Sequence, residues 1–126
     1  MRLLHHFYST NGVRPSPTHR SAKSGVLYMI WSNTVKRNDG KDPDYCVFVR
    51  KSVGGKLAGP WTKDTLLFSK NGGHGMIFRA FDGRLMLTLH QPNRTPDERM
   101  ALFTLDDTGD TLRLSASRAS SCLWRP

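Results

Sequence analysis

Three clusters of basic residues are prominent among the candidate functional groups of the sequence. The chain carries 19 lysines and arginines against 10 acidic residues, a formal net charge of +9. Aromatic residues interleave with the clusters, which could suit single-stranded nucleic acid stacked over a charged groove. No recognition motif accompanies them, so a solvated surface, or the loss of an acidic part, explains the charge more simply. The clusters are Arg14, His19, Arg20 and Lys23; Lys36, Arg37 and Lys41; and Arg50, Lys51 and Lys56, with Tyr28, Trp31 and Phe48 between them.

Other chemistries find little support in the residue spacing. Cys46 and Cys122 form neither a disulfide framework nor a zinc pattern, and we interpret them as free thiols in a reducing compartment. A nucleophile motif such as Gly-x-Ser-x-Gly is absent, and Gly54-Gly55 indicates a turn. No stretch approaches the roughly 20 apolar residues of a membrane span. Because no secretory signal is visible, we expect a cytoplasmic protein without a membrane partner.

Short apolar runs bounded by turn residues predict an all-β chain. Gly25, Gly83 and Gly109 stand where tight hairpin turns are expected. No window shows the apolar stripe of an amphipathic helix. The predicted strands are residues 26–32, 45–49, 76–80, 85–90, 100–105 and 111–114, with a further short strand that ends at Arg20.

An internal repeat organises these strands into two similar units. Aligning Gly25 with Gly83 places Leu27 on Leu85 and Trp31 on Leu89. A four-stranded antiparallel unit of this kind is a propeller blade. We therefore expect a partial β-propeller of two four-stranded blades. The blades lie at about residues 13–68 and 72–115, after an unassigned segment 1–12 and before a tail 116–126.

Two blades do not close a propeller, which needs about 4–8. Isolated blades leave strand edges and apolar faces open. Either copies of the chain associate, or the chain is a piece of something larger. A two-layer β-sandwich is the alternative architecture, and the periodicity alone does not separate the two.

Two stretches of the chain carry a family resemblance. Residues 72–79 read GGHGMIFR and residues 81–93 read FDGRLMLTLHQPN; upstream, 24–32 read SGVLYMIWS and 56–61 read KLAGPW. Together they resemble the last two blades of glycoside hydrolase family 43, over about residues 14–114. The resemblance implies a five-bladed propeller that acts on arabinose- and xylose-containing glycans. A pentose-containing oligo- or polysaccharide is then the expected partner, besides a missing propeller half.

The family mechanism implied by this resemblance is inverting hydrolysis with three carboxylates. The general base and the carboxylate that tunes the acid belong to earlier blades. In residues 14–20, RPSPTHR, Pro17 matches the family proline, so Pro15 stands where the general acid should be. Proline has no proton to give, and we therefore predict no catalytic residue and no hydrolysis by this chain alone. His19 could donate a proton only from a different position.

The resemblance also implies binding residues. His74 would face the central cavity and, as in related enzymes, hold a metal ion, commonly calcium. Calcium prefers six to eight oxygen ligands, so a single imidazole is a weak calcium site. Arg99 falls near a family arginine that reaches the substrate, or is a solvated charge at a strand edge. Trp31 and Phe78 could stack on sugar rings, or pack in the core as their alternate positions allow.

Three functions from different classes remain. The first is a glycosidase-like fragment without activity of its own. The second is a non-catalytic glycan-binding or oligomerising β module, and the third is a basic nucleic-acid-binding β protein. A steep fall of affinity with salt would mark the third.

Overall fold

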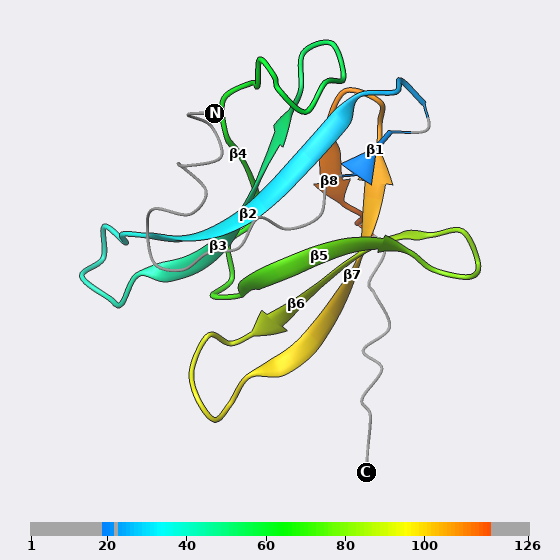
Figure 1. Cartoon of the computed structure of the whole chain (residues 1–126). Helices are drawn as coiled ribbons and strands as arrows, with labels where there is room; N and C mark the ends of the chain where they lie inside the picture. The colour runs from blue at the N-terminus through cyan, green and yellow to red at the C-terminus, as the bar shows by residue number, and fades with distance from the viewer. Residues whose placement is uncertain (1–18, 22, 117–126) are drawn as a thin grey trace.

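The chain folds into two four-stranded antiparallel sheets in the computed structural model, which describes residues 19–21 and 23–116 (Figure 1). In each sheet the strands pair in chain order, as a meander. This is the blade topology predicted from the repeat, whereas sandwiches connect their sheets by Greek keys. The first sheet holds β1 (His19–Arg20), β2 (Leu27–Val35), β3 (Asp44–Lys51) and β4 (Thr65–Phe68); the second holds β5 (Gly73–Arg79), β6 (Leu85–Gln91), β7 (Arg99–Asp107) and β8 (Leu112–Leu114).

The predicted turns and most predicted strands are present. Gly25, Gly83 and Gly109 have φ angles of 70°, 88° and 87°, the left-handed conformation that glycine adopts without a steric cost. No segment within the described ranges forms a helix able to cross a membrane.

The strand bounds differ from the prediction at several ends. The hairpin of β2 and β3 continues to the pair Val35 and Asp44, because its hydrogen-bonded ladder extends beyond the buried residues. β5 begins at Gly73 instead of Met76, with a register shift between these two residues. The prediction of a four-stranded first blade requires β4 but did not place it, because this short strand has two exposed residues followed by two buried ones and shows no apolar alternation.

One apolar core lies between the two sheets. Ile30 and Val47 of the first sheet and Leu87 of the second are fully buried. The rings of Phe68 and Phe103 lie 5.1 Å apart across the two sheets. Core residues recur at every second position along the central strands, such as Tyr28 and Ile30 in β2 and Leu85, Leu87 and Leu89 in β6, so the residues between them lie on the outer face of each sheet.

Candidate functional site

Two glycines allow close packing where β5 begins, on the second sheet at Gly72 and on the first sheet at Gly73. A Cβ atom at Gly73 would lie 2.1 Å from Cε1 of Tyr45, and one at Gly72 would lie 2.7 Å from the carbonyl oxygen of His90. No side chain fits in either place. The next residue, His74, has a φ of 52°, which is uncommon outside glycine. The glycine-rich sequence is thus needed for close packing, and it delivers His74 to the junction of the sheets.

His74 is surrounded by polar and aromatic groups from three other strands. Its backbone N–H donates to Oγ of Ser32 at 2.9 Å, and the Tyr45 hydroxyl lies 3.5 Å from its Nδ1. Its ring centroid lies 5.6 Å from that of Tyr45 and 5.0 Å from that of His90. We call Ser32, Tyr45, His74 and His90 the His74 cluster.

The surroundings of His74 and Tyr45 favour the uncharged forms of these two rings. Loss of solvent around the ring, and then the neighbouring His90, lower the pKa of His74. Burial raises the pKa of Tyr45, although a hydrogen bond with Ser32 acts in the opposite direction. At neutral pH the cluster therefore offers a neutral imidazole and a neutral phenol, which can donate and accept hydrogen bonds with sugar hydroxyls.

The loop after β6 adds polar groups beside the cluster. Asn93 Oδ1 lies 2.9 Å from Nε2 of His90. Glu98 is partly buried, and its hydrogen bond from Thr95 lowers its pKa, with His90 contributing in the same direction. Glu98 is therefore an ionised carboxylate at neutral pH and is unsuited to donate a proton.

Arg99 lies at the same end of the second sheet as the His74 cluster. It opens β7 and pairs with Gln91, one residue beyond His90. Its guanidinium donates to the backbone oxygens of Pro96 at 3.0 Å and Glu98 at 2.8 Å, and its side chain is exposed. Arg99 therefore lies at the same end of the second sheet as His74, but the residue that pairs with His90 is Met100, and the hydrogen bonds of the Arg99 guanidinium go to its own loop.

Trp31 and Phe78 lie on the two opposite outer faces. Trp31 packs on Phe48 with centroids 5.9 Å apart, and the Arg50 guanidinium lies 4.7 Å over its ring. Phe78 is 37% exposed and stands four residues from His74 along β5. Neither ring belongs to the core, so the core interpretation is wrong for both. They cannot stack on one sugar together, because the two sheets separate them.

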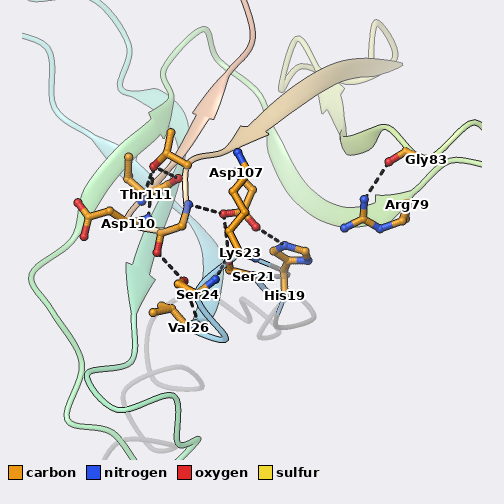
Figure 2. Close-up of polar contacts among 12 residues, drawn as sticks. His19, Ser21, Lys23, Ser24, Val26, Arg79, Gly83, Asp107, Asp110 and Thr111 are labelled. Carbon is orange, nitrogen blue, oxygen red and sulfur yellow. Dashed lines mark hydrogen bonds and ion pairs between the residues drawn. The ribbon is translucent and has the colours of Figure 1, made fainter.

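His19 lies away from the His74 cluster. It pairs with Tyr28, four residues along β2 from Ser32, a separation of about 13 Å. Figure 2 shows His19 and Ser21 turned toward Asp107, whose carboxylate accepts from Ser21 Oγ at 2.9 Å and lies 3.3 Å from His19 Nε2. We call His19, Ser21, Asp107 and Gly109 the Asp107 latch, since the Gly109 N–H also donates to this carboxylate at 2.9 Å.

The Asp107 latch joins the sheets and does not supply an acid. Burial raises the pKa of Asp107, but hydrogen bonds from Gly109, Ser21 and His19 outweigh it and leave the pKa below its usual value. An ionised carboxylate has no proton to donate at neutral pH. The position predicted for the missing acid, Pro15, lies outside the described residues, as do Cys122, residues 1–12 and the tail from 117.

The donors around His74 do not form a calcium site. The cluster offers two imidazoles, a phenol and a hydroxyl, whereas calcium prefers carboxylate and carbonyl oxygens. Among the residues that the structure describes, no group of three His, Cys, Asp or Glu side chains could hold a metal ion. Cys46 is a buried free thiol whose pKa is raised, chiefly by burial, so it is unreactive at neutral pH.

Several residues of the basic clusters are ion-paired. Arg37 contacts Asp39 at 2.6 Å and Asp44 at 3.0 Å. Arg50 pairs with Asp64, and Lys51 pairs with Asp110. These pairs agree with the interpretation of a solvated surface.

The pKa of His74 should be measurable by NMR. We expect a midpoint below the ordinary value of about 6.5, which rises in His90→Gln because one neighbouring charge is removed. Because the folded pKa is lowered, the contribution of His74 to stability is present above about pH 6.5 and is lost as the pH falls. An unchanged His74 midpoint in His90→Gln would contradict the coupling; Lys56→Gln, in the connection between β3 and β4 at the opposite end of the first sheet, is the control.

The sheets and their shared core define the class of fold: two blades of a β-propeller. A comparison with solved structures finds the crystal structure of an endo-arabinase from Bacteroides thetaiotaomicron VPI-5482, with a TM-score of 0.62 and 30% sequence identity. The match covers 76% of this chain and 33% of the arabinase, so the chain spans about a third of that enzyme's length. No protein-family model and no curated protein matches. The chain is therefore similar to part of a glycoside hydrolase.

Proposed function

We propose that the chain is a part of a family 43 five-bladed propeller that binds arabinose- or xylose-containing glycans at the His74 cluster. The observation that carries this proposal is the 30% identity with an endo-arabinase over 76% of the chain. The repeat of two blades and the motif around His74 support it. A chain that spans about a third of that enzyme would supply only part of a substrate cleft.

The proposed role of the described residues is to hold sugar and not to cleave it. Neutral His74 and Tyr45 exchange hydrogen bonds with hydroxyl groups, and Arg99 adds donors at the same end of the sheet. By resemblance, two of the three carboxylates belong to other blades, and Pro15 replaces the third. Without a general acid and base, each of which contributes typically 10²–10⁴-fold, no useful hydrolysis is expected from these residues alone.

Binding should be tested by titrating arabinotriose and xylotriose into the full chain. We expect saturable binding that His74→Ala weakens by about tenfold, because hydrogen bonds to the sugar are lost. Phe81→Ala, which removes a fully exposed ring elsewhere, is the matched control and should leave affinity unchanged. Pentose release should stay at background, and enzyme-like turnover would refute the prediction that the chain is inactive. If His74→Ala bound the sugars as tightly as the parent chain, the proposed binding site at the His74 cluster would be refuted.

Exposed apolar side chains on the outer faces favour a second candidate, an oligomerising module. Leu66 on the first sheet is 51% exposed, and Met76 and Met100 on the second are 50% and 73% exposed. Apolar faces of this kind are suited to pack against further blades. Sedimentation across a concentration series tests this candidate: growth in mass supports self-association, and a monomer at all concentrations contradicts it.

A further inference from the structure

A polar hollow of about 300 Å³ lies at the opposite end of β2 from the His74 cluster. It is bordered by β2, β3, the segment that leads into β4 and the turn before β8. Neither the His74 cluster nor the family resemblance uses this place. The lining includes Tyr28, Arg50, Lys51, Lys63, Thr65 and Asp110.

Tyr28 lines the hollow, and its buried hydroxyl lacks a hydrogen-bond partner within the described part of the chain. The residue is 1% exposed, and its hydroxyl oxygen forms no hydrogen bond among the described residues. Burial, followed by the charges of Asp107 and Asp110, raises the pKa of Tyr28 to about 12. The hydroxyl therefore keeps its proton near neutral pH. An unpaired buried donor is costly, so an acceptor atom supplied by a ligand would relieve this cost.

Among the residues that the structure describes, Lys63 is the unpaired charge of the hollow. The lining holds the cationic residues Arg50, Lys51 and Lys63 and the carboxylate of Asp110, but the Arg50 guanidinium lies over the Trp31 ring. Arg50 and Lys51 have acidic partners, but Lys63 forms no ion pair with the described residues. The Asp110 side chain is 83% exposed, so water screens its charge more than that of Lys51, which is 32% exposed. The unpaired ammonium of Lys63 and the unpaired hydroxyl of Tyr28 are both donors, so they favour a ligand that is negatively charged and rich in acceptors.

We propose that this hollow binds a small oxyanion, a carboxylate or phosphate group, through the Lys63 ammonium and the Tyr28 hydroxyl. Lys51 can exchange its exposed partner Asp110 for the ligand, since charge-assisted hydrogen bonds to oxyanions are strong. Thr65, on the same wall, adds a hydroxyl donor. The proposal does not depend on catalysis or on glycan binding at the His74 cluster.

NMR titration of the full chain with inorganic phosphate, and separately with glucuronate, tests the proposal. We expect saturable shifts at the hollow with at least one of them, at constant ionic strength. Binding of phosphate alone would indicate that the natural ligand is a free anion, and binding of glucuronate alone would indicate a carboxylated sugar. Tyr28→Phe, which removes only the unpaired hydroxyl, should weaken binding by about tenfold, and Lys63→Gln by several-fold. Lys36→Gln, which makes the same charge change far from the hollow, should bind like the parent.

The change in affinity caused by Asp110→Asn distinguishes a site for oxyanions from a site for neutral polyols, because the two predict changes in opposite directions. Removing a negative charge should tighten oxyanion binding several-fold, whereas losing an acceptor should weaken the binding of a hydroxyl-rich ligand. Absence of saturable shifts with both probes would overturn the proposal. So would unchanged affinity in Tyr28→Phe, or weaker binding of both probes in Asp110→Asn.

Discussion

Replacing Gly73 with alanine is expected to lower the free energy of unfolding by about 3 kcal/mol, as overpacking of a closed site does. The added Cβ would lie 2.1, 2.5 and 2.7 Å from three atoms of the Tyr45 ring. This ring packs against His74 and His90, with centroids 5.6 and 5.8 Å away, so it has little room to withdraw. Urea unfolding followed by fluorescence measures the loss.

Two further variants make the Gly73 prediction specific. Gly40→Ala adds a methyl group where no atom lies within 4 Å, but at a φ of 73°, so it should lose only about 1–2 kcal/mol from backbone strain. In a Tyr45→Ala background, Gly73→Ala should lose much less than in the parent chain, because the clashing ring is gone. An equal loss in both backgrounds would show that Tyr45 is not the cause.

The second large effect is expected at Asp107. Asp107→Ala should lower the free energy of unfolding by about 3 kcal/mol, because buried hydrogen bonds to a charged group contribute about 1.5–3 kcal/mol each and their donors would lose a partner. The donors are Ser21 Oγ and the Gly109 N–H, with His19 beside them, and the Asp107 side chain is only 11% exposed. Asp110→Ala is the matched control. It removes an 83% exposed carboxylate from the adjacent turn and should lose less than about 1 kcal/mol.

The pH dependence of the Asp107 latch follows from the direction of its pKa shift. The folded pKa of Asp107 lies below its ordinary value of about 4, despite burial, because of the hydrogen bonds from Gly109, Ser21 and His19. Its stabilisation is therefore complete above about pH 4 and is lost as the pH falls through the folded value. Asp107→Asn should show a flatter stability profile in this acid range. If the profile of Asp107→Asn were as steep as that of the parent chain, other groups would be responsible for the loss of stability in acid.

Local signals were sufficient to predict the two blades. Gly25, Gly83 and Gly109 mark hairpins because only glycine adopts their left-handed turn conformation at no cost, and that requirement is visible in the sequence. The alternation of apolar residues predicted most strands. It missed β4 (Thr65–Phe68), where only Leu67 and Phe68 are buried and the sequence shows no alternation.

The candidate site was only partly predictable. The resemblance predicts His74 and Arg99 as binding residues, but it gave no sign of their neighbours Tyr45, Ser32 and His90, because these come from other strands. The glycine-rich segment was visible as a motif. The reason for it, a Tyr45 ring that occupies the space of a Gly73 side chain, depends on the contact between the sheets.

The all-β class and the two four-stranded units follow from the sequence alone, because turns and alternation are properties of neighbouring residues. The opposite outward directions of Trp31 and Phe78, and the contact of His19 with Asp107, 88 residues away, depend on how the two sheets pack. A period of two separates the faces of a strand but does not say which face is buried. That choice is made when the two sheets pack against each other.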